Sequence, residues 1–120
     1  DYATQAQLES IFAAYRAFQP EQALAEADRF LREHPRHPQV AYLLYLRGMI
    51  NFTRNQSIFD NSAVVDTTKR DVGAARRAFD DFSSLVGRFP DSPYAADARQ
   101  RMIYLRNRIA AHEIHVGNYT

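Results

Sequence analysis

Four histidines are the residues of this chain best suited to bind a metal ion or move a proton. They form two pairs, His34 with His37 and His112 with His115, each three residues apart. The first pair lies between prolines, and the second is one residue short of the spacing that places two zinc ligands on one helix face. Because neither pair has a third ligand in view, the sequence predicts no metal site.

Other arrangements that could support catalysis are equally weak. The chain has no cysteine, its serines and histidines do not form a nucleophile motif, and no glycine-rich stretch could hold a phosphate. The adjacent acids Asp80 and Asp81 fall on the side of a helical pattern that faces away from its apolar residues, so we expect both to be solvated. We therefore predict no catalytic residue and no cofactor, and an enzyme is the weakest functional reading.

Composition indicates a compact folded domain and makes nucleic acid an unlikely partner. The 120 residues are 46% hydrophobic, which is enough to form a core, and the net charge of +1 provides no broad positive field for nucleic acid. The longest apolar runs are well short of the ~20 residues that cross a bilayer. The first residues lack the pattern of a signal peptide, so we expect any targeting segment to be removed or to lie outside this sequence.

The spacing of apolar residues predicts an all-α chain of five helices. The first covers roughly residues 3–18, with Leu8, Ile11, Phe12 and Tyr15 on its inner face. The second begins at Pro20 and ends before His34, and the third begins at Pro38 with an inner set that extends to Thr53. A polar stretch, Asn55–Arg70, interrupts the pattern; Asp71 then caps a fourth helix, and a fifth extends from Tyr94 to about Thr120.

The second and fourth helices carry the same pattern 55 residues apart. The matched positions include Ala23 with Ala78, Phe30 with Leu85, and the prolines at 35 and 38 with those at 90 and 93. Helix pairs that repeat in this way are typical of an α-solenoid, and the tetratricopeptide period is 34 residues, which leaves an insertion of 21. We predict one domain, 1–120, with a repeat at about 2–35, a second at 38–90 that contains an insertion at about 54–71, and the first helix of a third at 93–120, together forming a right-handed superhelix.

Two segments strengthen this reading, RRAFDDFSSLVGRFPDSPYAADARQRMIYLRNRIAAHE (76–113) and ALAEADRFLREHPRHPQVAYLLYLRG (23–48). They resemble the BamD (ComL) family, tetratricopeptide lipoproteins of the machine that assembles β-barrels in the bacterial outer membrane. The resemblance covers essentially the whole chain and corresponds to the middle of such a protein. It implies a non-catalytic scaffold on the periplasmic face of the outer membrane, attached through a lipid anchor that this sequence does not include.

The resemblance also implies partners. These are the periplasmic domains of the barrel-assembly subunit (BamA-like), accessory lipoproteins, and the C-terminal signal of unfolded barrel proteins. Two alternatives stay open: another periplasmic tetratricopeptide adaptor, for example one that coordinates cell-wall synthesis with envelope constriction, and a peptide-binding adaptor of the cytosolic co-chaperone kind. A lipid-modified cysteine upstream of this sequence would favour the β-barrel assembly role over both alternatives.

Two sets of residues are candidates for the partner surface. On the fifth helix, one apolar strip includes Leu105 and a second includes Ile103 and Ala110, so we expect both strips to be packed. The remaining face carries Arg101, Tyr104 and Arg108, residue types that are common at binding hot spots. In the interrupted segment, Ile58 and Phe59 are too apolar for a free linker and either cover the core or anchor a partner.

Overall fold

The computed structural model describes residues 2–60 and 69–117, and it describes side chains at 2–54 and 73–111. Every regular element in these ranges is an α-helix, which confirms the predicted fold class. The chain divides into two compact units, Asp1–Leu43 and Leu44–Thr120.

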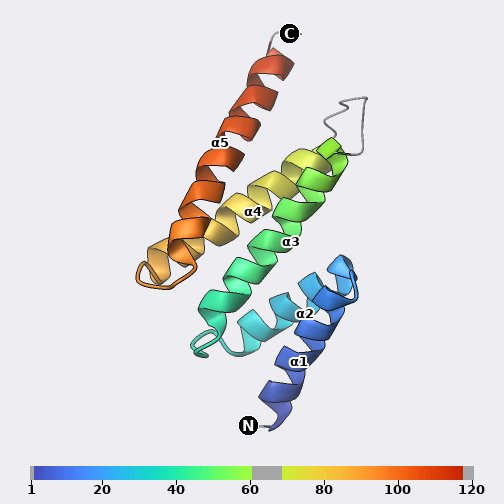
Figure 1. Ribbon diagram of the computed structural model, residues 1–120, viewed down its shortest axis with the longest axis vertical. Coiled ribbons are helices and arrows are strands. Elements are labelled where there is room, and N and C mark those ends of the chain that lie inside the picture. Colours follow the sequence, from blue (N-terminus) through green and yellow to red (C-terminus); the bar gives the residue numbers. More distant parts are fainter. Residues whose placement is uncertain (1, 61–68, 118–120) are drawn as a thin grey trace. The chain divides into compact units, whose positions relative to one another are not determined.

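The first unit is built on an antiparallel pair, α1 (Tyr2–Arg16) and α2 (Pro20–Glu33) (Figure 1). Pro20 occupies the first turn of α2, as expected, and the helix ends one residue before His34. The fully buried side chains of α2 are Ala23, Ala27 and Phe30.

The inner face of α1 differs from the prediction at one position. Leu8 and Ile11 are buried as expected, but Tyr15 is 42% exposed and Ala14, at 2%, occupies the interior instead. The small side chain of Ala14 suits the close contact between α1 and α2, and Tyr15, the next residue along the helix, lies outside this contact.

The third helix, α3 (Val40–Asp60), is longer than predicted. It includes the first six residues of the expected break, 55–60, because these residues include no glycine or proline that would end a helix. Thr53, expected to face inward, is exposed. The expected cap Asp71 was also wrong, since α4 (Lys69–Arg88) begins two residues before it; arginine and lysine are good helix formers, and capping patterns fix a boundary only to within a few residues.

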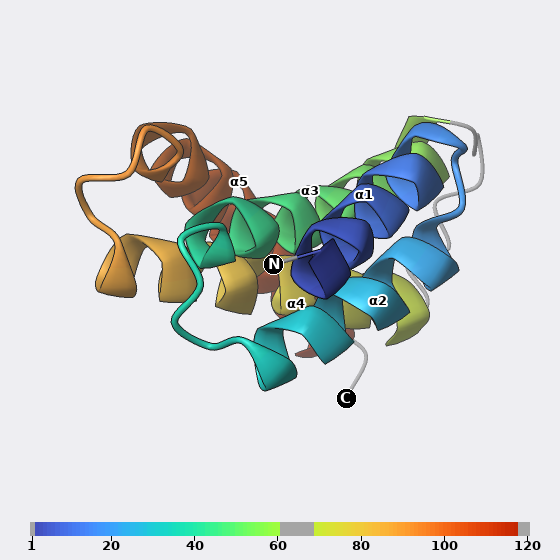
Figure 2. The ribbon, with the colours of Figure 1, turned by 90° about the horizontal axis from the view of Figure 1, so that it is seen from below.

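In the second unit α3, α4 and α5 (Ala95–Gly117) follow one another in alternating directions (Figure 1). Seen end-on, α3 and α5 lie in one layer and α4 lies in the other (Figure 2). The core between them contains Ala75, Ala78, Phe82 and Leu85 of α4, together with Leu46 and Ile50 of α3 and Ala98 and Leu105 of α5.

The 55-residue repeat is visible in the backbone as well as in the sequence. At the end of α2 the His34 amide donates to Phe30 O over 2.8 Å, and at the end of α4 the Phe89 amide donates to Leu85 O over 2.8 Å. The next three backbone hydrogen bonds of each corner also match, with donors at 37, 40 and 43 in one and at 92, 95 and 98 in the other. The two proline corners therefore share one local structure. The assignment of whole repeats at 2–35, 38–90 and 93–120 stays a prediction.

A different side chain caps the helix in each corner. Ser92 Oγ accepts the Tyr94 amide at 3.1 Å just before α5. At the matching place before α3, His37 Nδ1 accepts the Gln39 amide at 3.0 Å. Because Nδ1 accepts, the His37 ring carries its hydrogen on Nε2. His37 therefore caps α3 in the same way as Ser92 caps α5.

Candidate docking surface

Four consecutive residues of α3, Tyr45-Leu46-Arg47-Gly48, contribute to the core of the second unit or contact its other helices. Leu46 is 3% exposed and belongs to the core. Arg47 forms an ion pair with Asp81 of α4. The Cβ-free face of Gly48 lies against the ring of Phe82. The Tyr-Leu-Arg-Gly segment therefore connects α3 to α4 through adjacent contacts.

Asp81 does not lie on a solvated face, as the sequence led us to expect. Its side chain is 9% exposed, and it accepts hydrogen bonds from Arg47 Nε at 3.0 Å and Nη2 at 2.7 Å. The prediction was correct for Asp80, which is exposed. An apolar pattern on one helix cannot show that a neighbouring helix supplies a cation, and it is this cation that makes burial of the carboxylate tolerable.

Tyr45 connects α3 to the first turn of α5. Its hydroxyl donates to Asp97 Oδ2 at 2.6 Å, and Arg101 Nε donates to the same oxygen at 2.7 Å. The Tyr45 ring also stacks on Tyr94, with centroids 5.1 Å apart and an angle of 22° between the planes. The carboxylate is thus fixed from both sides, by a residue of α3 and by one of its own helix.

These contacts change the protonation behaviour of all three groups. The hydrogen bond from Tyr45 is the main cause that lowers the pKa of Asp97 below its usual value, and Arg101 lowers it further. Burial, followed by the hydrogen bond to Asp97, raises the pKa of Tyr45. Burial opposes the charge of Arg101, but Asp97 outweighs it and raises the pKa of that guanidinium. The group therefore stays a tyrosine hydroxyl, a carboxylate and a guanidinium at neutral pH.

Aromatic rings continue the contacts along α5. The Arg101 guanidinium lies 4.7 Å from the centroid of the Phe52 ring, and the Phe52 and Tyr104 rings are 5.5 Å apart. Arg108 lies 5.5 Å from the Tyr104 centroid. We call Phe52, Arg101, Tyr104 and Arg108 the α3–α5 ladder. Within it, Tyr104 is 36% exposed.

The structure brings three predicted partner residues together but corrects their surroundings. Arg101, Tyr104 and Arg108 do share one side of α5, yet this face is packed against Phe52 of α3. Arg101 also forms an ion pair with Asp97, four residues earlier on the same helix. The i, i+4 spacing of Asp97 and Arg101 was the signal that could have shown this ion pair.

The second apolar strip of α5, which the sequence predicted to be packed, is exposed. Ile103, expected to be packed, is 48% exposed, and Ala110 is exposed too. Ala110 and Ile109 line a groove of about 410 Å³ between α4 and α5, together with Phe79 and with Arg76, Asp80 and Arg106 at its edges. Periodicity gives the faces of a helix, but the neighbouring helix decides which face is covered.

Two further predicted anchors, Ile58 and Phe59, have side chains outside the described residues, although α3 includes their backbone. The side chains of His112 and His115 are outside them as well. Nothing in the structure tests these residues.

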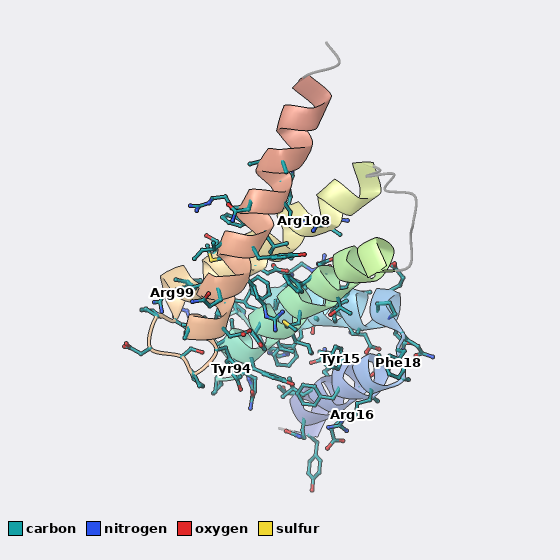
Figure 3. The ribbon with its side chains drawn as sticks, turned by 45° about the horizontal axis from the view of Figure 1, so that its top comes forward. Tyr15, Arg16, Phe18, Tyr94, Arg99 and Arg108 are labelled. Carbon is teal, nitrogen blue, oxygen red and sulfur yellow. The ribbon has the colours of Figure 1, made fainter. Side chains whose placement is uncertain are left out.

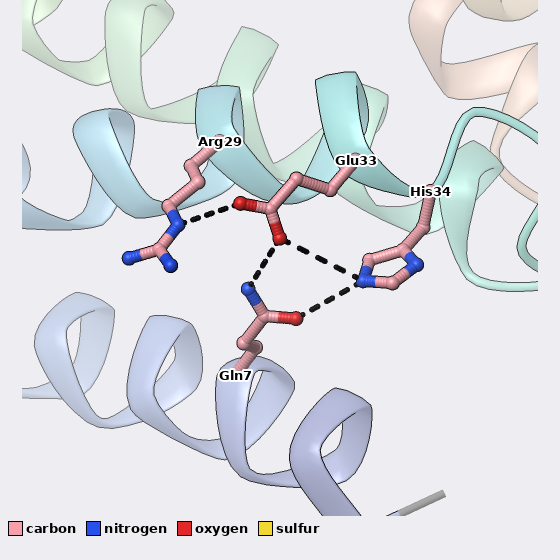
Figure 4. A network of polar contacts seen from close by, with 4 residues as sticks. All are labelled: Gln7, Arg29, Glu33 and His34. Carbon is pink, nitrogen blue, oxygen red and sulfur yellow. Dashed lines mark hydrogen bonds and ion pairs between the residues drawn. The ribbon is translucent and has the colours of Figure 1, made fainter.

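His34 takes part in a polar network between α1 and α2 (Figure 4). Its Nε2 lies 3.1 Å from Gln7 Oε1, and Gln7 Nε2 donates to Glu33 Oε2 at 3.2 Å. Arg29 Nε donates to the other oxygen of Glu33 at 2.7 Å, and this hydrogen bond is the main cause that lowers the pKa of Glu33.

His34 and His37 also share an aromatic neighbour, since both rings contact Phe30, at 4.8 and 5.2 Å between centroids. Both histidines therefore have structural contacts in the corner. Across the residues that the structure describes, no three histidine, aspartate or glutamate side chains gather as metal ligands would. In the same residues, no helix is long and apolar enough to cross a membrane.

Repeated helix pairs, a 55-residue register and matching proline corners define the class of protein: a tetratricopeptide-like α-solenoid. The chain belongs to the YfiO family, described as outer membrane lipoproteins, whose sequence model matches residues 1–120. The family description associates such proteins with the outer membrane.

Several bacterial proteins named outer membrane protein assembly factor BamD are similar to this chain. The relative from Neisseria meningitidis serogroup B is 43% identical over 98% of the chain and 44% of the relative. Those from Xylella fastidiosa strain 9a5c and Vibrio cholerae are 37% and 34% identical over 98% of the chain, and over 40% and 49% of their own lengths. The chain therefore spans less than half of the length of these relatives.

Proposed function

We propose that this chain is a non-catalytic docking module of an outer membrane protein assembly factor, acting on the periplasmic face of the outer membrane. The name of its relatives supports assembly as the process, and it favours this role over cell-wall coordination or a co-chaperone adaptor. In this role the module contacts the periplasmic domains of the barrel-assembly subunit and accessory lipoproteins, and it can receive the C-terminal signal of unfolded barrel proteins.

The observation that carries the proposal is the α3–α5 ladder. Tyr104 is held between Phe52 and Arg108 yet leaves 36% of its surface exposed, so a partner meets a ring whose position is already fixed. A fixed aromatic ring loses little conformational entropy on binding, which is why tyrosine and arginine recur at hot spots. Ile58 and Phe59 remain proposed as apolar anchors of the same partner surface.

Binding kinetics with the purified periplasmic domains of the barrel-assembly subunit test the proposal. Tyr104→Ala should weaken binding by about 10-fold, mostly through faster dissociation. Arg108→Glu should slow association and flatten its salt dependence, because charges at the surface act over a Debye length of about 8 Å. Arg101→Glu should do the same, but it also removes the ion pair with Asp97, so its free energy of unfolding is measured alongside. The double variant Ile58→Ala with Phe59→Ala should speed dissociation with little effect of salt.

Arg99→Glu is the matched control. Arg99 is an exposed arginine of the same helix. It lies nine residues from Arg108, about 180° around the helix, and Figure 3 shows the two on opposite sides of α5. If Arg99→Glu and Arg108→Glu change the association rate equally, net charge explains the effect and the ladder is not the docking surface.

A further inference from the structure

One carboxylate oxygen of Asp97 accepts hydrogen bonds from two helices. Its Oδ2 receives the Tyr45 hydroxyl at 2.6 Å and Arg101 Nε at 2.7 Å. Because both donors use the same atom, a rotation of the carboxylate that leaves one donor leaves the other as well. The orientation of the Arg101 guanidinium on α5 is therefore coupled to a hydroxyl on α3.

The ion pair of Asp97 with Arg101 is too exposed to fix the guanidinium by itself. The Asp97 side chain is 45% exposed and that of Arg101 is 27% exposed. Such a pair loses side-chain entropy when it is held in one geometry, and in water it gains little in return. A second constraint on the carboxylate is needed to keep the pair in one orientation.

Tyr45 supplies this constraint because its own ring is held by two others. The ring stacks on Tyr94, with centroids 5.1 Å apart, and its centroid is 6.1 Å from that of Phe82, which is fully buried in the core. A ring packed in this way keeps its hydroxyl in one place. Tyr45 therefore relays a fixed position from the core to the Asp97 carboxylate.

The helix repeat does not itself require this arrangement. The matching hydrogen bonds of donors 43 and 98 make Tyr45 equivalent to Gln100, which is exposed. The same register makes Arg101 equivalent to Leu46, a core residue that is 3% exposed. The chain thus has an arginine where the preceding helix of the repeat has an apolar side chain, and it provides groups that hold this arginine.

We propose that Tyr45 is a positioning residue for the docking surface, which acts through Asp97 to hold Arg101 in the orientation that a partner meets. The guanidinium then lies on the Phe52 ring, 4.7 Å from its centroid, before any partner binds. A side chain that is already ordered loses less entropy in the complex. This inference rests on the proposed docking role of the α3–α5 ladder, although Tyr45 itself lies outside the ladder.

Tyr45→Phe tests the first step without any partner. The variant loses one hydroxyl and keeps the ring that stacks on Tyr94. The NMR signal of the Arg101 Nε–H should shift, and this hydrogen should exchange faster with water, because the carboxylate that accepts it becomes free to turn. Tyr15→Phe is the matched control, since it removes the hydroxyl of a 42% exposed tyrosine on α1. An Arg101 signal that Tyr45→Phe leaves unchanged would overturn the proposal.

Binding kinetics with the purified periplasmic domains of the barrel-assembly subunit test the second step. If only a fraction of the Tyr45→Phe molecules hold Arg101 correctly, the apparent affinity falls by that fraction. We expect an association rate about threefold lower, with the dissociation rate and the salt dependence unchanged. This result would differ from that of Tyr104→Ala, which removes a contact and should act mostly through dissociation.

Arg101→Lys shows whether Tyr45 acts through Arg101. Lysine keeps the charge but has no planar guanidinium to lie on the Phe52 ring. Tyr45→Phe should slow association by about threefold in the original chain and have no further effect in Arg101→Lys. The same slowing in both backgrounds would contradict the proposal. His37→Ala, which loses a helix cap before α3, controls for lost stability and should leave the association rate unchanged.

The failure of this inference can be told from the failure of the proposed function. If Tyr104→Ala weakens binding and Tyr45→Phe does not, the docking surface is correct and the positioning role is wrong. If neither Tyr104→Ala nor Arg108→Glu changes binding, the docking role is wrong, and the inference that rests on it is wrong too. Faster dissociation of Tyr45→Phe with normal association would mean that the hydroxyl contacts the partner directly, which also overturns the proposal.

Discussion

Gly48 of α3 and Phe82 of α4 are in such close contact that a methyl group cannot fit between them. A Cβ atom added to Gly48 would lie 2.6 Å from Cε1 of the Phe82 ring, and this ring is fully buried. The absence of a side chain at position 48 therefore sets how closely the two helices approach.

Gly48→Ala should lower the stability of the chain, although alanine is the better helix former. The clash should cost about 1–3 kcal/mol, which exceeds the gain of about 1 kcal/mol in helix propensity. Gly73→Ala in α4 is the control, because its added Cβ would meet only the flexible end of Arg77 at 3.5 Å. Chemical denaturation should show the first variant destabilised and the second stabilised; equal shifts would contradict the packing argument.

The ion pair between Arg47 and Asp81 should be far more sensitive to substitution than its exposed neighbour. Asp81→Asn leaves the Arg47 guanidinium without its carboxylate in a part-buried position and should cost about 2–4 kcal/mol. Asp80→Asn, one residue away and exposed, should change the free energy of unfolding by less than about 0.5 kcal/mol. Similar effects of the two changes would show that Asp81 is solvated after all.

The cap that His37 provides should be replaceable by serine. His37→Ala removes the acceptor of the Gln39 amide and should cost about 1 kcal/mol, as should Ser92→Ala in the matching corner. His37→Ser should keep most of the stability, because a serine performs this task 55 residues later. Thermal unfolding checks the set, and a large loss in His37→Ser would assign the role of His37 to its ring contact with Phe30 instead.

The contacts of Asp97 predict a loss of stability in acid. Its pKa is lowered in the folded state, mainly by Tyr45, so the folded state binds fewer protons than the unfolded state around the normal pKa of aspartate. The stabilisation is present above the unfolded pKa of about 4 and disappears as the pH falls through the lower folded value. In Asp97→Asn, the dependence of unfolding free energy on pH between about 5 and 2 should be shallower.

The raised pKa of Tyr45 predicts a loss of stability at alkaline pH. Its pKa is raised by burial and by Asp97, so the stabilisation is complete below the unfolded value of about 10 and disappears as the pH rises through the folded value. Tyr45→Phe should lose about 0.5–1.5 kcal/mol at neutral pH and should also flatten this alkaline limb. An unchanged pH profile in Tyr45→Phe would show that its hydroxyl is not coupled to Asp97.

The sequence was sufficient for the helices and their repeat. Apolar residues at i, i+3 and i+4 and prolines in the first turns act within a few residues of the chain, so they can be read locally. The corner from His34 to Leu43 and its counterpart from Phe89 to Ala98 share hydrogen bonds because short-range backbone rules and the same proline spacing act in both. The helix ends were predicted less exactly, as at Asp71, where several residues could begin the helix.

The tertiary structure decided which faces are used, because that depends on a neighbour far away in the sequence. Phe52 of α3 covers the side of α5 with Arg101 and Tyr104 and leaves Ile103 exposed, and Arg47 makes the burial of Asp81 possible. The left-handed backbone of Phe18, with a φ of 57°, was likewise invisible in the sequence, since its residue type argues against that conformation. The apolar pattern of a helix shows which of its residues can be buried. The contact with neighbouring helices determines which of them are buried.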